Sequence, residues 1–421
     1  MIYNKLIPEA PPSIRMANSN QVPKYYRQWL KLLYWFSFFM AFPSVLILNQ
    51  NISVFLFGGM LLMVMGYSKR AIVTLRRPIQ WFALYFAIGA VLSVVNIPDS
   101  APYDSLDRAL AVLPNYLYWC LLIIFMVAHR QLINLQIVYR GIFYGLSATV
   151  IYYLFLEDSL RALPIFNRQT PNNFAFILIC YTPLAIHYLM TKAGRFIAFL
   201  FLLLLTFVLL FDGRRAGTVL VFLGGLSTLY GTSLNWKNLL KITMVGIISL
   251  MLLQTRIAKT FILHASERMY QLIYKTSEIG EKDSSFLIRV AMVKKGIAIY
   301  CEYPYTGIGL NNFSNYNIQF DKSFEGAEYV IYKENLQKKS AHNSYITLLA
   351  EGGMILLSGF LLIVGTCLVY LVKNYFLMPS ETRPIFIGFV AMFIHLYFIS
   401  AIVNVFAWFL IGLACAFTCR K

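Results

Sequence analysis

The chain has 421 residues, of which 59% are hydrophobic and only 13% are charged, and its mean hydropathy is +0.65. Because about 25% of the residues in soluble globular proteins are charged, this composition excludes a soluble enzyme and indicates an integral membrane protein. The formal net charge of +18 suits the basic segments that flank membrane spans, so we expect a lipid bilayer and no nucleic acid as a partner.

The first 28 residues form a polar segment, and the apolar run after it is long enough to stay in the membrane. A cleavable signal peptide would instead have a short apolar stretch followed by small residues. We therefore expect residues 1–28 to be a retained cytoplasmic tail.

Long apolar runs follow from residue 29 onward. A helix needs about 20 mainly apolar residues to cross the hydrocarbon core, and lipid permits only helices and closed barrels. These runs do not alternate in polarity, so they predict helices. We place transmembrane helices at residues 30–49, 52–67, 80–96, 109–128, 138–156, 172–190, 196–211, 216–231, 238–253, 345–372, 384–403 and 404–418. The predicted fold class is an all-α polytopic membrane protein with about twelve transmembrane helices.

The distribution of charge predicts the orientation of these helices, because cytoplasmic connections are enriched in lysine and arginine. With both termini in the cytoplasm, the inner connections contain Lys69, Arg70, Arg76, Arg77, Arg130, Lys192, Arg195, Lys237 and Arg383. The outer connections contain Asp99, Asp104, Asp107, Glu157 and Asp158. The predicted topology is therefore consistent with the charges along the chain.

The connection between the ninth and tenth predicted helices is much longer than the others and comprises residues 254–342. Connections of this length in a compact protein usually have a function or no fixed structure. Residues 286–313 have apolar and aromatic side chains at helical spacing, which predicts a large helical loop that caps the outer face. Helices 1–9 thus occupy residues 29–253, and helices 10–12 with a short cytoplasmic C-terminus occupy residues 343–421.

Arginines on the predicted outer face are the first candidates for a binding site. Arg214 and Arg215 precede the eighth predicted span, and Arg289 lies on the predicted loop helix. A guanidinium group stays protonated and binds phosphate oxygens through two parallel hydrogen bonds, and a helix N-terminus such as that at Arg215 also favours anions. Each arginine has an ordinary interpretation too: a membrane-flanking side chain for the adjacent pair, and a solvated helix face for Arg289.

His342 and Asn343 lie where the charged loop enters the tenth predicted span. A histidine exchanges protons near neutral pH, so His342 is a candidate catalytic residue, although the pair also suits an ordinary helix start. Glu351 lies deeper in the span, where an acid is costly and could line the same cavity. We interpret "GIGLNNF" at 307–313 as a tight turn rather than a phosphate-binding loop. No group of side chains has metal-ligand spacing, so no metal is predicted.

Three motifs, in this order around the large loop, resemble the O-antigen ligase and Wzy polymerase superfamily of bacterial envelopes. They are "DGRRAGTVL" at 212–220, "RVAMVKKGIAIYCEYPYTGIGLNNF" at 289–313 and "AHNSYITLLAEGG" at 341–353. The segment "NRQTPNNFA" at 167–175, which contains Arg168, is similar to the asparagine-rich start of the sixth span in that superfamily.

The sequence departs from the superfamily pattern at two places. The turn before the eighth span has two arginines, and we align Arg215 with the superfamily residue because Gly217 follows two positions later. After Gly353 the sequence continues as "MILL", where many members have another glycine.

The resemblance implies a glycosyltransferase of the bacterial inner membrane whose active site faces the periplasm. Its donor would be a glycan on undecaprenyl pyrophosphate, and its acceptor a sugar hydroxyl of lipid A core. Arg215 and Arg289 would bind the pyrophosphate and neutralise its charge as it leaves. Arg214, Arg168 and Asn343 would contribute to substrate binding.

The resemblance also implies the role of His342. This histidine would accept the proton of the acceptor hydroxyl or orient that hydroxyl for attack on the anomeric carbon. The attack would come from the face opposite the leaving group and invert the anomeric centre. Because the arginines would neutralise the leaving group, we expect neither a metal nor a cofactor.

Three other functions stay open from the sequence alone. A Wzy-type polymerase would join lipid-linked repeat units, and the sequence contains no signature of the acceptor that would distinguish it from a ligase. A transporter of a lipid-linked anion would need the arginines but would tolerate the loss of His342. A membrane scaffold with an outer sensor cap would need none of these side chains.

Overall fold

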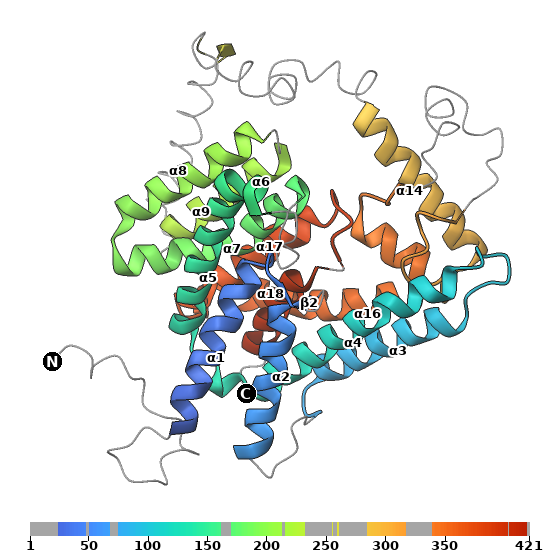
Figure 1. Cartoon of the computed structure of the whole chain (residues 1–421), viewed down its shortest axis with the longest axis horizontal. Coiled ribbons are helices and arrows are strands. Elements are labelled where there is room, and N and C mark those ends of the chain that lie inside the picture. The colour runs from blue at the N-terminus through green and yellow to red at the C-terminus, as the bar shows by residue number, and fades with distance from the viewer. Residues whose placement is uncertain are drawn as a thin grey trace.

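The computed structural model of the chain describes residues 24–47, 50–67, 75–160, 170–212, 215–231, 255, 259–260, 284–316, 339–402 and 404–418. Figure 1 shows a bundle of helices with α14 beside the connected ends of α3 and α4. The helices of the N-terminal half are α1 (Lys24–Ala41), α2 (Ile52–Tyr67), α3 (Pro78–Val95), α4 (Ser105–Ala128), α5 (Leu135–Ile151), α6 (Glu157–Leu160), α7 (Pro171–Lys192) and α8 (Arg195–Phe211). Those that follow are α9 (Arg215–Tyr230), α14 (Ser284–Glu302), α16 (Ser344–Asn374), α17 (Arg383–His395) and α18 (Val405–Thr418).

Short irregular elements join some of these helices. A π-helical turn, Tyr152–Leu156, continues α5 into α6. Two-residue strands β1 (Leu46–Ile47) and β2 (Gln50–Asn51) pair antiparallel between α1 and α2. Single 3₁₀ turns follow α4 at Arg130–Leu132 and α16 at Tyr375–Leu377.

Five of the described helices are long and apolar enough to cross a membrane. They are Pro78–Val95, Ser105–Ala128, Leu135–Leu156, Pro171–Lys192 and Ser344–Leu377. Shorter apolar helices are Ile52–Met65, Arg195–Leu210, Ala216–Tyr230, Arg383–His395 and Val405–Thr418. These elements confirm the all-helical membrane class. The total of twelve spans stays a prediction, and the predicted span at 238–253 lies outside the described residues.

Two helices are shorter than the apolar runs that predicted them. The run at 30–49 is helical only to Ala41, because Pro43 lacks an N–H group and disfavours helical geometry in the residue before it. The run at 384–403 is helical only to His395. Beyond His395 the backbone bonds to the start of α16, which is part of the candidate site.

Aromatic side chains fill the space between α3, α4, α16 and α18. The rings of Trp119 and Trp408 stack with their centroids 5.0 Å apart and their planes at 8°. Phe86 and Phe360 lie 5.2 Å and 5.9 Å from Trp408, and all four side chains are buried. Such aromatic pairs stabilise packing beyond the effect of their buried area, so this cluster joins the four helices.

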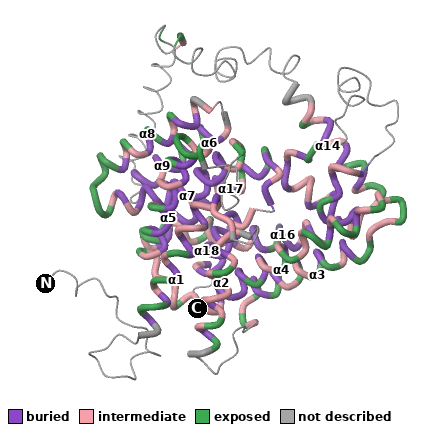
Figure 2. Tube along the Cα trace, viewed as in Figure 1, coloured by how far each residue is buried: buried purple, intermediate pink, exposed green. Residues whose placement is uncertain are grey.

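Burial separates central helices from peripheral ones (Figure 2). Every residue of α18 from Phe406 to Ala416 is buried, and most of α7 is buried as well. By contrast, α8 exposes a set of large apolar side chains: Phe196, Ile197, Leu200, Leu203, Leu204 and Phe207. An apolar surface of this kind is rare on soluble proteins and suits contact with lipid.

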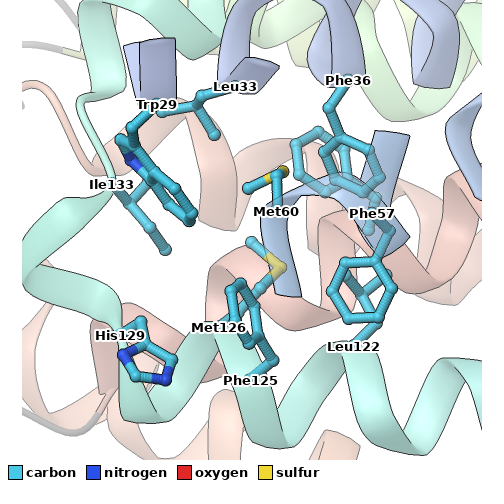
Figure 3. Close-up of a pocket in the computed structure, with 11 residues that line it drawn as sticks. Trp29, Leu33, Phe36, Phe57, Met60, Leu122, Phe125, Met126, His129 and Ile133 are labelled. Carbon is cyan, nitrogen blue, oxygen red and sulfur yellow. The ribbon is translucent and has the colours of Figure 1, made fainter. Parts of the chain in front are cut away.

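An apolar pocket lies between α1, α2, α4 and α18 (Figure 3). Its lining includes Trp29, Phe57, Phe125 and Phe409. The side chains that α4 contributes come from the C-terminal end of that helix, whereas the candidate site contacts its N-terminal end. The pocket and the candidate site therefore lie at opposite ends of α4.

Candidate active site

His342 precedes α16 in a backbone conformation that few residues adopt. Its φ is 50°, which lies in the left-handed region where non-glycine residues are uncommon and often functional. The next residue, Asn343, is extended and caps the helix. Its side-chain oxygen accepts hydrogen bonds from the N–H groups of Tyr345 (3.0 Å) and Ile346 (3.2 Å). This cap fixes His342 at the start of α16 and leaves only the Asn343 NH₂ group for the predicted contact with substrate.

The segment between α17 and α18 holds the first turn of α16. The N–H of Ser344 donates to the carbonyl oxygen of Leu396 at 2.9 Å. Its hydroxyl donates to the carbonyl oxygen of Ile399 (2.6 Å) and accepts from the N–H of Ala401 (3.0 Å). Because these backbone groups bond to Ser344, they do not continue α17 as a helix, and the helix ends before the apolar run does.

The environment of His342 favours its uncharged form. The side chain is half-buried, and burial lowers its pKa below the ordinary value for histidine. The positive charges of Arg289 and Lys339 lower this pKa further. At neutral pH the imidazole is therefore uncharged and able to accept a proton.

A small hydrophobic cluster places α14 beside His342. Ala291 and Met292 of α14 are buried in it together with Phe313 and Ala341. Because Ala341 adjoins His342 in the sequence, the cluster brings this part of α14 to the catalytic candidate. Arg289 is exposed two residues before Ala291, and its charge acts on the His342 ring. The structure thus brings together two of the predicted catalytic residues.

Lys295 is a buried base on α14 that the sequence analysis did not select. Its Nζ lies 4.9 Å from the centroid of the Phe313 ring, which is within the range of a cation–π interaction. Burial lowers the pKa of Lys295 to about 8. This contact adds to the packing of α14 against the turn that contains Phe313.

A tight turn after α14 fits into a break in α16. At Gly353 the helix is interrupted by a residue with φ 61° and ψ −164°. After the break, the N–H groups of Met354 and Ile355 donate to the carbonyl oxygens of Pro304 (2.8 Å) and Tyr305 (3.3 Å). Before the break, the carbonyl oxygens of Ala350 and Glu351 accept from the N–H groups of Ile308 (3.0 Å) and Gly309 (3.0 Å). The apolar run predicted at 345–372 is therefore helical on both sides of a break rather than continuous.

Two glycines allow this close approach. Gly353 and Gly307 both have left-handed φ values, 61° and 67°. A Cβ atom on Gly353 would overlap the carbonyl group of Tyr305, and one on Gly307 would overlap the backbone of Glu351. Only glycine satisfies both the backbone conformation and the missing space at these positions.

Glu351 binds the same turn through its carboxyl group. The carboxyl oxygens accept hydrogen bonds from the N–H of Asn311 (2.9 Å) and the N–H of Phe313 (3.1 Å). The side chain is buried. Two N–H groups of "GIGLNNF" at 307–313 thus bind a carboxyl group of the protein itself, and three others bind backbone carbonyl oxygens, which agrees with a tight turn rather than a phosphate-binding loop.

Replacement of Glu351 by alanine should destabilise the protein, because it leaves the buried N–H group of Phe313 and the part-buried N–H group of Asn311 without acceptors. We expect a loss of about 1–3 kcal/mol for the buried Phe313 N–H group, measured as a lower unfolding temperature in detergent. Glu351→Gln keeps one acceptor and should have an intermediate effect. Glu302→Ala, at an exposed position of α14, is the control. Equal unfolding temperatures for Glu351→Ala and Glu302→Ala would contradict this role.

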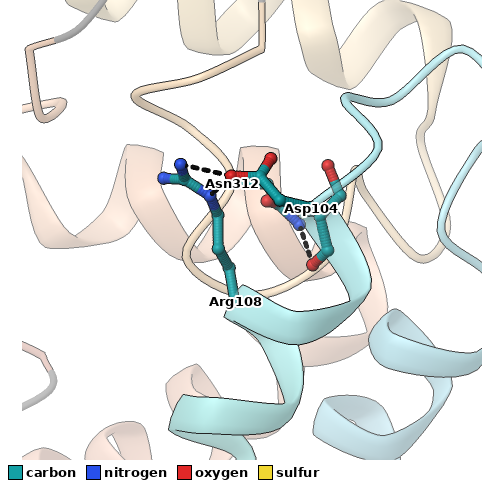
Figure 4. Close-up of polar contacts among 4 residues, drawn as sticks. Asp104, Arg108 and Asn312 are labelled. Atoms are coloured by element: carbon teal, nitrogen blue, oxygen red, sulfur yellow. Dashed lines mark hydrogen bonds and ion pairs between the residues drawn. The ribbon is translucent and has the colours of Figure 1, made fainter.

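The other side of the turn contacts the start of α4 (Figure 4). The side-chain amide of Asn312 donates to the carbonyl oxygens of Ser105 (3.1 Å) and Ile308 (3.4 Å). An ion pair flanks this contact, in which Arg108 Nε donates to an Asp104 carboxylate oxygen at 2.7 Å. The acidic connection before α4 and the turn after α14 therefore lie on the same side of the bundle.

The remaining predicted arginines are only partly described. Arg215 is the first residue of α9, in agreement with its predicted place at a helix N-terminus, but its side chain lies outside the described part. Arg214 and Arg168 lie outside the described residues altogether. Their roles in substrate binding stay predictions.

The packing of α9 against α17 indicates where Arg215 lies. The guanidinium group of Arg383, at the start of α17, donates to the carbonyl oxygen of Gly231, just after α9, at 3.2 Å. Since the two helices also pack against each other, and Gly224 of α9 lies beside Ile387 of α17, they are antiparallel. The start of α9 with Arg215 is therefore at the same end of the bundle as His395, the last residue of α17.

The π-helical segment that follows α5 contacts Asp212, the C-cap residue of α8. The hydroxyl of Tyr153 donates to the Asp212 carboxylate at 2.9 Å. The Tyr153 ring also stacks on Phe174 of α7, with centroids 3.9 Å apart and planes at 7°. π-helical turns occur frequently at functional sites, and this one joins α5, α7 and the turn that leads to Arg215.

A second histidine near Arg289 was missed by the sequence analysis. The charge of Arg289 acts on His395 as well as on His342. In the sequence, His395 lies within the apolar run at 384–403, where a single histidine gives no signal of function. His395 lies beside the start of α16 because α17 ends at this residue and does not continue through the apolar run.

Comparison with known families bears on this arrangement. Residues 199–361 match the family model described as O-antigen ligase. This segment of the chain is therefore similar to the O-antigen ligase family. A comparison with curated proteins finds no match. The matched segment begins within α8 and ends within α16, so it contains Arg215, Arg289 and His342 as well as the break at Gly353. The resemblance found in the sequence motifs is confirmed.

Proposed function

We propose that this protein transfers a glycan from undecaprenyl pyrophosphate to a sugar hydroxyl of lipid A core. The observation that carries the proposal is the convergence of Arg289 and His342, which come from α14 and from the segment before α16. A permanent cation beside an uncharged imidazole suits a reaction in which an anionic group leaves and a hydroxyl loses its proton.

The arginines would bind the leaving group. Arg289 and Arg215 each present a planar guanidinium group that matches two phosphate oxygens. Arg215 adds the N-terminus of α9, where free N–H groups and the helix dipole favour an anion. As the bond between the anomeric carbon and the phosphate oxygen breaks, its electron pair goes to the pyrophosphate, and these groups stabilise the charge that develops.

His342 would act on the acceptor. The acceptor oxygen forms a bond to the anomeric carbon from the face opposite the pyrophosphate, so the anomeric centre is inverted. The hydroxyl proton goes to the uncharged imidazole of His342, which later releases it to solvent. No metal is needed, because the guanidinium groups supply the positive charge. The backbone conformation of His342 and the cap at Asn343 hold the imidazole in position for this step.

The proposed setting is the bacterial inner membrane, with the site at the periplasmic face and both termini in the cytoplasm. The acceptor distinguishes the ligase from the main alternative, a Wzy-type polymerase that joins lipid-linked repeat units. A transporter of the same lipid-linked anion would bind it without needing His342. The ligase, the polymerase and the transporter would all bind a pyrophosphate-linked lipid, so the glycan found on lipid A core and on the lipid carrier distinguishes them.

The surface polysaccharide of cells lacking the gene tests the proposal when they are complemented with wild type, Arg215→Ala, Arg289→Ala or His342→Ala. With a ligase, the deletion and the three variants should leave lipid A core bare while long polymer accumulates on undecaprenyl pyrophosphate. Lys294→Ala, which removes another base from α14, is the control and should restore the wild-type pattern. Protein levels are compared by immunoblot.

Three other results would contradict the ligase. Lipid A core that carries a single repeat unit would mean polymerase activity. Restoration of the wild-type pattern by all three alanine variants would overturn the mechanism. Restoration by His342→Ala alone would favour transport over group transfer.

A further inference from the structure

His395 is a buried histidine that the mechanism above does not use. Its side chain is 7% exposed, and its Nδ1 atom has no hydrogen-bond partner among the described residues. Buried polar atoms in folded proteins nearly always have a partner, and those that lack one are often completed by water or a ligand. The Nδ1 atom of His395 is therefore a candidate contact for a bound molecule.

The surroundings of His395 place it at the candidate active site. Its ring lies between aromatic side chains, 5.6 Å from Phe176 of α7 and 6.4 Å from Phe398 by ring centroids. The next residue, Leu396, accepts the hydrogen bond from Ser344. His395 thus directly precedes Leu396, the acceptor of this hydrogen bond, and His342 lies two residues before Ser344, its donor.

Charge provides the second connection to the site. Arg289 acts electrostatically on both imidazoles, which connects both histidines to the same cation. The antiparallel packing of α9 and α17 also places the start of α9, with Arg215, at the end of the bundle where His395 lies. The start of α9 is therefore on the same side of the bundle as His395, whose Nδ1 has no partner among the described residues.

Another histidine is buried in the same way as His395 but does not lie at the candidate site. His187 of α7 is 6% exposed, and its Nδ1 is also without a partner among the described residues. Its ring lies 5.4 Å from that of Tyr139, and it follows Phe176 by 11 positions in the same helix. At about 1.5 Å per residue, these positions are about 16 Å apart along α7. His187 therefore belongs to a different level of the bundle and serves as a matched control.

We propose that His395 is a further binding residue of the site and donates a hydrogen bond from its imidazole to a phosphate oxygen of the lipid pyrophosphate donor. The inference rests on the proposed function. An imidazole ring has at least one N–H group that can donate such a hydrogen bond. An anion bound to Arg289 would bring oxygens to that donor and provide the partner that it lacks.

The experiment measures binding of undecaprenyl pyrophosphate to the full chain in lipid nanodiscs. His395→Leu should weaken binding about tenfold, as expected for loss of a hydrogen bond to a charged group. His395→Gln, which keeps an N–H donor, should recover part of the affinity, and His187→Gln should bind like wild type. For undecaprenyl monophosphate, the difference in affinity between wild type and His395→Leu should be smaller, because this lipid has fewer phosphate oxygens.

A second measurement uses the wild-type protein and does not depend on the folding of a variant. Undecaprenyl pyrophosphate should slow the carbethoxylation of His395, measured by mass spectrometry, and leave that of His187 unchanged. Equal rates at His395 with and without the lipid would overturn the proposal. So would equal affinities of wild type and a folded His395→Leu protein, provided that Arg289→Ala loses binding. Absence of binding by wild type would overturn the proposed function itself and this role with it.

Discussion

Replacement of His342 by alanine should lower the rate of glycan transfer by about 10²–10⁴-fold, the usual contribution of a general base. The alanine side chain cannot accept the hydroxyl proton, whereas the groups that bind the pyrophosphate are unchanged. Donor affinity should therefore stay close to that of wild type. The measurement is a single-turnover assay in nanodiscs with a lipid-linked donor and lipid A core as acceptor.

A matched variant separates proton transfer from orientation. His342→Gln can still form a hydrogen bond with the acceptor hydroxyl but cannot take its proton at neutral pH. If His342 is the base, the glutamine variant should be as slow as the alanine variant. A rate close to wild type for His342→Gln would mean that the residue orients the hydroxyl. His187→Ala controls for the loss of a histidine from the protein interior, and a wild-type rate for His342→Ala would contradict both roles.

The pH dependence of transfer should report the same histidine. Burial, Arg289 and Lys339 lower the pKa of His342, so its uncharged form dominates at neutral pH and is lost only as the pH falls below the ordinary value of about 6.5. The rate should therefore decline on the acid side. Lys339→Gln removes one of the positive charges, which raises this pKa and should move the acid limb to higher pH.

Replacement of Arg289 by alanine should lower transfer by about 10²–10³-fold, the size of the effect expected when a group that stabilises developing charge is removed. Unlike His342→Ala, this variant should also bind undecaprenyl pyrophosphate more weakly. Arg289→Lys keeps the charge but not the planar fork that binds two phosphate oxygens, so it should recover only part of the rate. Transfer rates and lipid affinity are measured on the same nanodisc samples.

Lys294→Ala is the control for Arg289, because it removes a base from the same helix. Five residues at about 100° each place Lys294 about 140° around α14 from Arg289. It should retain wild-type transfer. If Arg289→Ala and Lys294→Ala have the same modest effect, Arg289 belongs to a solvated helix face and does not bind the pyrophosphate.

Composition and apolar run length were sufficient to predict the helical membrane class, because the cost of unpaired backbone groups in lipid leaves few alternatives. They did not predict where helices stop within an apolar run. The segment after His395 is as apolar as α17 itself, and its backbone is diverted only because Ser344 offers hydrogen bonds. The break at Gly353 likewise depends on a turn that arrives from another part of the chain.

The candidate site was predicted by residue type more than by position. His342 was selected because a polar pair precedes a long apolar run, and Arg289 because a loop helix was expected around it. That α14 meets the start of α16 depends on Ala291, Met292 and Ala341, which are common core residues with no sequence signal of their own. Glu351 was expected to line the cavity, whereas the structure shows it bound to backbone N–H groups.

The turn inserted at Gly353 determines how this protein could be recombined with its relatives. A chimera that exchanges only the outer loop, cut at residue 342, would place a foreign turn against a native break and leave Glu351 facing the wrong backbone. A transplantable unit would run from α14 through residue 355 and would carry the connection before α4 with it. Substrate preference, if transferred between relatives, should follow that larger module rather than the loop alone.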